Sequence, residues 1–174
     1  CKPRTGEVME NTSQPVFTLR RVLERSAAKF ADRPALSGLG EEPVTYRELH
    51  EASQCLAQLL EETGIGFGDK VAILSENCPQ WGVAYFAVTS MGAVAVPILT
   101  EFHSDAIAHI IRHSEAKAVF VSHRLFPKLE GVDFDPEPLF INLDSFTPIS
   151  HLNRDTLRDL KNAGYREFRK LREK

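Results

Sequence analysis

Two hydrophobic runs dominate the pattern of the chain, with a helix-like segment between them. Lys70–Leu74 has no polar side chain after its opening lysine, and Ala93–Ile98 has none at all. Residues 79–91 are apolar or aromatic on several sides and begin with Pro79, which predicts a largely buried helix. Two nearly uninterrupted apolar strands joined by one helix indicate a βαβ unit, and we expect both strands to be buried on both faces of a parallel sheet.

Two amphipathic helices are predicted before this unit. Thr18 can cap a helix that runs to about Ala31, and Thr45 can cap another that runs to about Thr63. Glu48 stands three residues after Thr45, which is the spacing of a capping box. Each predicted helix therefore begins at a side chain that can accept hydrogen bonds from the free amides of the first turn.

Glycines mark two turns around these helices. Short β segments at 35–37 and 43–46 flank Gly38-Leu39-Gly40, which predicts a hairpin. Residues 64–68 have the spacing G-x-G-x-G, follow a helix and open a strand. A dinucleotide-binding loop has the opposite order, strand before helix, and the spacing G-x-G-x-x-G. We therefore interpret residues 64–68 as a helix C-cap followed by a tight turn.

The second half of the chain continues the alternation of strand and helix. A helix is predicted at 104–113 and strands at 116–122 and 139–143, with the last of these as the final strand. The fold class is therefore α/β, an open, mostly parallel, doubly wound sheet with helices on both faces. We divide the chain into a flexible N-terminus (1–16), an α/β subdomain (17–150) and an amphipathic helix capped by Asn153 (151–174) that leads into a further part of the protein.

Composition and charge narrow the class of protein. The 174 residues are 43% hydrophobic and 26% charged, which is typical of one sizeable globular domain. The net charge of −3 gives no electrostatic reason to expect nucleic acid as a partner. Residues 151–174 hold eight Lys or Arg among four Asp or Glu, and this interleaving favours a packed helix over a nucleic-acid or membrane patch.

Targeting signals and cysteines bear on the location of the protein. No apolar run approaches the roughly 20 residues of a membrane span, and residues 1–15 lack the apolar core of a signal peptide. Cys1, Cys55 and Cys78 show no C-x-x-C spacing, which favours a reducing compartment. We expect a cytoplasmic protein, with peripheral membrane contact as an alternative. Because the chain starts at Cys1, we interpret it as a trimmed or cut piece.

Three groups of residues have types that can carry chemistry. Asp105, His109 and His113 are spaced four residues apart on one predicted helix, but ligands two turns apart do not easily reach one ion, so a solvated surface is favoured over a metal site. His103-Ser104-Asp105 has the residue types of a nucleophilic triad, but adjacent residues cannot face each other across a pocket. Cys78 lies beside a strand-to-helix turn, where a packing role is favoured over a reactive thiol.

Several segments, in this order and spacing, resemble the start of the AMP-forming acyl-CoA synthetases of the adenylate-forming superfamily. Val44–Leu49 matches the motif [LV]TY-x-EL, and Met91–Ile98 matches a Gly-Ala strand that ends at proline. Between them, 68–74 matches GD[KR]VAI. Residues 75–81 and 107–121 are most similar to the long-chain fatty acid branch. The resemblance covers about residues 17–129.

This resemblance implies the chemistry of a longer parent enzyme. ATP, Mg²⁺ and coenzyme A are its expected cofactors, and a fatty acid is converted to an acyl-adenylate and then to acyl-CoA. The family's phosphate loop, ribose-binding acid and C-terminal lysine have no counterpart in the sequence, so we expect no catalytic, cofactor-binding or metal-binding residue here and no activity of the chain alone. In some relatives the segment after the second motif lies near the coenzyme A nucleotide, which would bring Thr100, Arg124 or Lys128 near phosphate. Solvated loop positions are the favoured interpretation of these three residues.

Other hypotheses remain open on the sequence alone. One is the N-terminal part of an adenylation enzyme for an amino or aryl acid. A second is a stand-alone binding or assembly module that forms a homodimer, since a truncated sheet leaves an unpaired edge. If the chain is instead the severed start of the enzyme, we expect the remaining C-terminal part of the enzyme to be its partner. A third is a small flavodoxin-like protein that binds AMP or FMN, against which the lack of a phosphate loop speaks.

Overall fold

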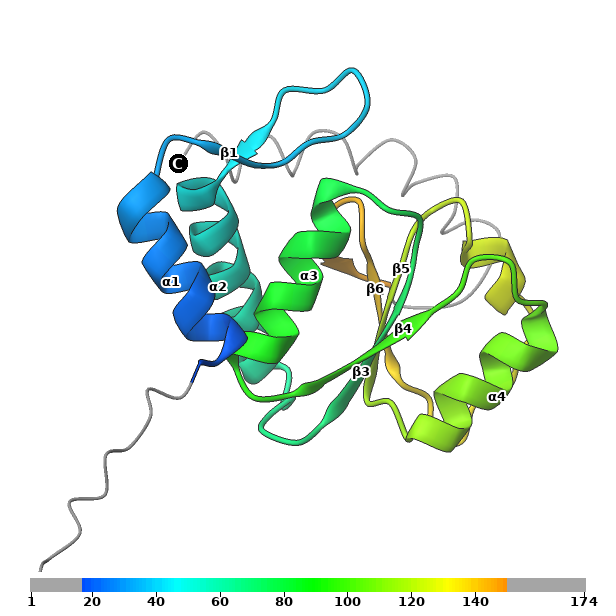
Figure 1. Cartoon of the computed structure of the whole chain (residues 1–174). Coiled ribbons are helices and arrows are strands. Elements are labelled where there is room, and N and C mark those ends of the chain that lie inside the picture. Colours follow the sequence, from blue (N-terminus) through cyan, green and yellow to red (C-terminus); the bar gives the residue numbers. More distant parts are fainter. Residues whose placement is uncertain (1–16, 150–174) are drawn as a thin grey trace, which may run out of the picture.

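A computed structural model describes residues 17–149 of the chain. Figure 1 shows a sheet with helices on either side. In chain order the elements are α1 (Leu19–Phe30), β1 (Pro34–Leu36), β2 (Val44–Thr45), α2 (Tyr46–Glu62), β3 (Lys70–Leu74), α3 (Pro79–Ser90), β4 (Val94–Ile98), α4 (Ser104–Ser114), β5 (Ala118–Val121), the 3₁₀ turn η1 (Phe126–Leu129), β6 (Leu139–Asn142) and β7 (Thr147–Pro148).

The main sheet has the strand order β4-β3-β5-β6-β7 within the described residues. β3 pairs in parallel with both β4 and β5, and β5 pairs in parallel with β6. β7 pairs antiparallel to β6. The prediction of an open, mostly parallel sheet is confirmed. The prediction that β6 is the last strand is wrong, because residues 147–148 fold back to add a short antiparallel strand.

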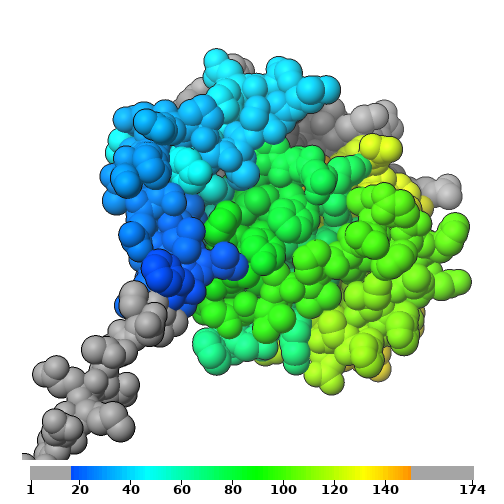
Figure 2. Space-filling model, viewed as in Figure 1, coloured from blue at the N-terminus to red at the C-terminus, as the bar shows by residue number. Residues whose placement is uncertain are grey.

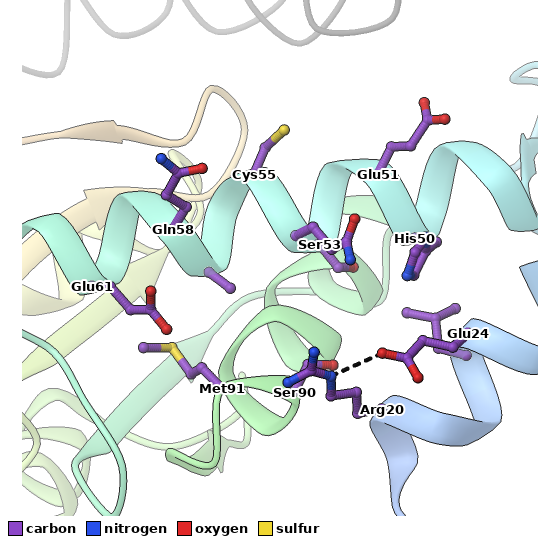
Figure 3. A pocket seen from close by; sticks show the side chains of 13 residues that line it. Arg20, Glu24, His50, Glu51, Ser53, Cys55, Gln58, Glu61, Ser90 and Met91 are labelled. Carbon is purple, nitrogen blue, oxygen red and sulfur yellow. Dashed lines mark hydrogen bonds and ion pairs between the residues drawn. The ribbon is translucent and has the colours of Figure 1, made fainter.

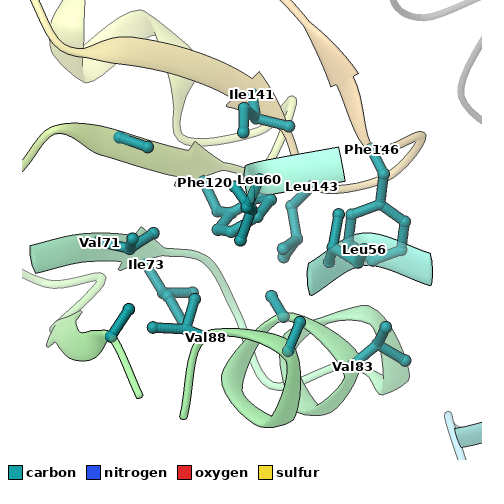
Figure 4. Close-up of a cluster of buried hydrophobic side chains, with 14 of the residues drawn as sticks. Leu56, Leu60, Val71, Ile73, Val83, Val88, Phe120, Ile141, Leu143 and Phe146 are labelled. Carbon is teal, nitrogen blue, oxygen red and sulfur yellow. The ribbon is translucent and has the colours of Figure 1, made fainter. Parts of the chain in front are cut away.

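Alternate residues of the central strands feed two separate hydrophobic cores. Val71 and Ile73 of β3 face α2 and α3, whereas Ala72 and Leu74 face α4 and η1. β5 repeats this division, with Phe120 on the first side. Figure 4 shows part of the first core, where side chains of β3, β5 and β6 meet those of α2 and α3. The sheet is therefore covered on both faces, as a doubly wound fold requires.

The helix starts follow the sequence signals. Thr18 caps α1 by accepting a hydrogen bond from the Arg21 amide, 3.2 Å away. In α2 the Thr45 and Glu48 side chains form both bonds of the capping box. Pro79 occupies the first turn of α3, where its missing N–H is not needed. All three predicted starts are confirmed.

The predicted turns are also confirmed. β1 and β2 pair antiparallel around the loop at 37–43, one residue earlier than predicted at the start of β1. Gly64 and Gly68 have φ values of 86° and 79°, in the left-handed region that glycine adopts without strain. The Ile65 amide donates to the Leu60 carbonyl, which completes the C-cap of α2. Figure 2 shows α1 and the hairpin, coloured blue to cyan, beside the green surface, which is formed by residues that come later in the chain.

One expectation about burial is wrong. β3 is buried on both faces, but β4 is a half-exposed strand at the edge of the described sheet, and Val94 is 47% exposed. α1 likewise buries only Leu23, while Leu19 and Val22 remain exposed. The predicted flexible N-terminus (1–16) and C-terminal helix (151–174) lie outside the described residues.

Candidate functional site

The carboxyl ends of the parallel strands form the candidate site. From β3 the chain passes through α3 to β4 on one side, then through α4 to β5 on the other side of β3. This reversal makes the carboxyl ends of β3 and β5 the topological switch point, which is where open α/β sheets bind ligands. Residues 75–78 and 122–124, which follow β3 and β5, and residues 142–145, which begin with the last residue of β6, will be called the carboxyl rim.

Glu76 joins two loops of the carboxyl rim. The Ser122 hydroxyl donates to Glu76 Oε2 at 2.7 Å, and Arg124 Nε lies 3.4 Å from Glu76 Oε1. Ser122 is 4% exposed, whereas the Arg124 side chain is 82% exposed. The carboxylate therefore ties β3 to β5 through a buried hydroxyl and leaves the guanidinium free to contact solvent or a ligand.

A second set of bonds joins the loops after β5 and β6. Asp144 Oδ2 accepts a hydrogen bond from the His123 amide at 3.0 Å, and the Asp144 amide donates to Asn142 Oδ1 at 2.8 Å. Asn142 is 1% exposed, and its Nδ2 has no hydrogen-bond partner among the described residues. An unpaired buried amide is costly, so this part of the carboxyl rim has a donor that a further group can satisfy.

Lys128 lies beside the carboxyl rim and holds the loop after β4. Its Nζ donates to the carbonyl oxygens of Thr100 at 2.6 Å and of Phe102 at 2.8 Å. The Thr100 hydroxyl donates to Glu101 at 2.9 Å and so keeps the pKa of that carboxyl below its usual value, with a smaller contribution from the Lys128 charge. The favoured interpretation of Lys128 as a solvated loop residue is wrong, because its ammonium bridges two segments.

Cys78 closes the β3 side of the carboxyl rim. It is the N-cap residue of α3, and its Sγ lies 3.9 Å from Ser75 Oγ. Burial raises the pKa of the thiol, and the nearby Asp144 charge acts in the same direction. The raised pKa favours the neutral thiol, and Cys78 packs half-buried against the first hydrophobic core, as its interpretation as a packing residue predicted.

The other sequence candidates are not members of the carboxyl rim. His103 is the N-cap residue of α4 and makes no side-chain cap bond, so 103–105 mark a helix start. The rings of His109 and His113 stack with centroids 5.6 Å apart, a contact that the sequence analysis did not anticipate. Among residues 17–149, no group of three or more His, Cys, Asp or Glu side chains is placed to hold a metal ion.

Sequence reasoning missed Glu76, Ser122 and Asn142 as members of one site. The available signal was their position at or just beyond the ends of three buried strands, since the carboxyl ends of parallel strands meet at one edge. The strand order, which brings β5 rather than β4 next to β6, was needed to place them together.

A separate groove of about 660 Å³ lies between α1, α2 and α3. Figure 3 shows His50 pointing into it from α2, toward Glu24 and Arg20 of α1, while Glu51 and Cys55 point away. The Arg20 and Glu24 side chains form an ion pair at 2.9 Å, and the Ser53 hydroxyl donates to the Val83 carbonyl at 3.3 Å. Arg20, Glu24 and Ser53 are thus engaged, whereas the buried His50 Nε2 has no hydrogen-bond partner among the described residues.

No helix within residues 17–149 combines the length and apolar character needed to cross a bilayer.

Relatives of this chain include an acyl-CoA ligase and a peptide synthase. The long-chain-fatty-acid–CoA ligase of Thermus thermophilus is 33% identical over 135 residues, which cover 75% of this chain and 25% of that protein. Tyrocidine synthase 2 of Brevibacillus parabrevis is 31% identical over 144 residues, which cover 80% of this chain and 4% of that protein. The chain thus spans a quarter or less of the length of these relatives.

Solved structures with the same fold are adenylation enzymes. The anthranilate CoA ligase AuaEII in complex with anthranoyl-AMP aligns with a TM-score of 0.70 at 22% identity, over 82% of this chain and 27% of that one. The N-terminal subdomain of Klebsiella oxytoca NpsA in complex with anthranilyl-AMSN aligns with a TM-score of 0.56 at 28% identity, over 60% of this chain and 27% of that one.

A family model described as "AMP-binding enzyme" matches residues 23–163, which include every element from β1 to β7 and with them the whole carboxyl rim. The chain belongs to the AMP-binding enzyme family.

Proposed function

We propose that this chain is the N-terminal part of an AMP-forming acid–thiol ligase that acts on a long-chain fatty acid. The observation that carries the proposal is the family match over residues 23–163, in which the topological switch point of the sheet is built. Relatives named long-chain-fatty-acid–CoA ligase, from Bacillus subtilis at 30% identity and Thermus thermophilus at 33%, support the choice of acid.

The proposed reaction has two steps. A carboxylate oxygen of the acid attacks the α-phosphorus of ATP, and pyrophosphate leaves as the acyl-adenylate forms. The sulfur of coenzyme A then attacks the acyl carbonyl carbon, and AMP leaves as the thioester forms. Mg²⁺ supplies charge neutralisation for the phosphates, because phosphoryl chemistry depends on positioning and electrostatics.

Within this reaction the described residues supply a scaffold and a charged edge. Arg124 is the cation of the carboxyl rim that remains most open to solvent. We therefore assign it to contact with the phosphates of coenzyme A. Lys128 holds the loop after β4 in place and orients Thr100 beside it. We propose that the 174-residue chain by itself forms no acyl-adenylate.

An alternative is an adenylation enzyme for an amino or aryl acid. It is favoured by the similarity to tyrocidine synthase 2 and to the NpsA subdomain. Both proposals share the adenylation step and differ in the acid that enters it.

Pyrophosphate release by the full-length gene product tests both, with palmitate, octanoate, benzoate, anthranilate and the amino acids as substrates. Release with palmitate alone supports the first proposal, and release with an aryl or amino acid alone supports the alternative. No release with any acid contradicts both. Acyl-adenylate trapped as a hydroxamate from the 174-residue chain would contradict the proposal that it is inactive.

The role of Arg124 is tested in the same full-length protein. Arg124→Ala should raise the KM for coenzyme A several-fold and leave pyrophosphate release almost unchanged. Arg47→Ala is the matched control, since Arg47 is also an exposed arginine in a surface ion pair but lies on α2. Equal effects of the two substitutions would contradict the assignment.

A further inference from the structure

Two histidines on α4 lie one turn apart with their rings facing each other. His109 and His113 are both exposed, their ring centroids are 5.6 Å apart, and their ring planes differ by 8°. Side chains at i and i+4 of a helix are neighbours on one face. The pair therefore presents four imidazole nitrogens to solvent at one place.

The charged groups around His109 and His113 are arranged so that a cation can bind beside the two rings. Arg112, the nearest basic side chain in sequence, is turned away, since it donates to the Asp133 carbonyl and lies over the Phe134 ring. Asp105 lies one turn earlier on the same face, and no ion pair engages it among the described residues. His113 is in the last turn of α4, where the helix dipole favours positive charge.

We propose that His109 and His113 form a surface chelating site for a divalent transition-metal ion, of the class that prefers imidazole nitrogen: Zn²⁺, Ni²⁺ or Cu²⁺. Each histidine supplies one ring nitrogen, and water or a group from another molecule fills the remaining positions. The same helical spacing of two histidines supplies ligands in known zinc motifs.

The geometry needs only side-chain rotation. Metal–nitrogen bonds of about 2.0–2.1 Å place two ligating nitrogens about 3–4 Å apart. The parallel rings are already on the same side of the helix, and exposed side chains change rotamer freely. Glu115, the next acid in the sequence after the pair, is engaged with Lys70 at 3.5 Å.

The site is tested by isothermal titration of the 174-residue chain without a histidine tag. Cys1→Ser and Cys55→Ser are introduced first, so that these thiols do not bind metal. At pH 7.5, where free imidazole is mostly neutral, Ni²⁺ and Zn²⁺ should bind with a stoichiometry of about one. Mg²⁺ should not bind detectably, because it prefers oxygen ligands.

Matched substitutions decide the outcome. His109→Gln and His113→Gln should each lower the affinity for Ni²⁺ at least tenfold, whereas His103→Gln, an exposed histidine at the start of the same helix, should leave it unchanged. Circular dichroism checks that each variant folds, and saturating Ni²⁺ should raise the melting temperature of the parent protein but not of the two pair variants. Unchanged affinity in both pair variants, equal loss in His103→Gln, or the absence of saturable Ni²⁺ binding would overturn the proposal.

Discussion

β3 and β4 are the two strands of one βαβ unit, yet they have very different surroundings. β3 lies between β4 and β5, and α3 and α4 cover its two faces, so Val71, Ile73 and Leu74 are fully buried. β4 has a neighbour on one side only within the described sheet, and Val94 and Pro97 are exposed. Apolar composition alone therefore does not distinguish a central strand from an edge strand.

Pro97 is the sequence feature that distinguishes β4, the edge strand, from β3, the central strand. It pairs in register with Ile73, but a proline has no N–H to donate to a further strand on its outer side. Proline within sheets is confined mainly to edge strands and strand ends for this reason. On the sequence alone, Pro97 served only as the end of a Gly-Ala strand motif.

The largest expected effect comes from truncating the centre of β3. Ile73→Ala should lower the free energy of unfolding by about 2–5 kcal/mol, because the side chain is fully buried and a cavity remains. The matched control on β4 is Val94→Ala, which should cost less than about 1 kcal/mol at an exposed position. Urea denaturation measures both values, and similar losses would contradict the difference in burial.

An intermediate effect is expected at the turn that leads into β4. Gly92 has a φ of 81°, and a Cβ added there would lie 2.5 Å from the Phe67 ring. Gly92→Ala should therefore lower the free energy of unfolding by about 1–2 kcal/mol through backbone strain, plus the cost of moving the ring. Urea denaturation of the variant and the parent protein measures this loss.

The added substitution Phe67→Ala separates these two costs. Phe67 is 90% exposed, so its own truncation should be nearly neutral. In the double variant, only the part of the lost unfolding free energy that comes from the contact between the new Cβ and the Phe67 ring should be recovered. Full recovery of stability would show that the backbone conformation of Gly92 costs nothing, which contradicts this explanation.

The smallest effect is expected at the amino ends of β3 and β5. The Asp69 carboxylate lies 2.7 Å from Lys117 Nζ and accepts a bond from the Gly66 amide at 2.8 Å. The Lys117 bond is the main cause that holds the pKa of Asp69 below its ordinary value of 3.8. A lowered folded-state pKa means that the stabilisation is present above pH 3.8 and is lost as the pH falls through the lower, folded-state value.

Asp69→Asn should therefore reduce stability at pH 7, and the gap from the parent protein should narrow below pH 3.8. Asp32→Asn, at a carboxylate that is 87% exposed in a surface ion pair, is the control and should show a smaller gap. Urea denaturation over a pH series measures both gaps. A gap for Asp69→Asn that stays constant as the solution is acidified well below the ordinary pKa would contradict the role of the charged form.

The candidate site was less predictable than the fold, for a physical reason. A capping box or a left-handed glycine involves residues a few positions apart, so Thr45, Glu48 and Gly64 could be interpreted locally. The bond from Ser122 to Glu76 joins residues 46 positions apart and exists only because β5 lies beside β3. Likewise, Lys128 was interpreted as a solvated loop residue, because no local pattern indicates that its ammonium reaches the carbonyls of Thr100 and Phe102, 28 and 26 residues earlier.

Apart from η1 and β7, the amino-acid sequence by itself determined the order, type and approximate ends of the described helices and strands, because periodicity, caps and turn residues act within a few residues of one another. It also determined the family through motifs whose spacing is local. Only the tertiary structure decided which apolar strand is central, which polar side chains share the carboxyl edge, and that His109 pairs with His113 rather than with Asp105. The first two outcomes depend on strand order, which brings together residues far apart in the chain. The third depends on side-chain packing, because His109 has a possible partner one turn away on either side and the sequence does not say which one it contacts.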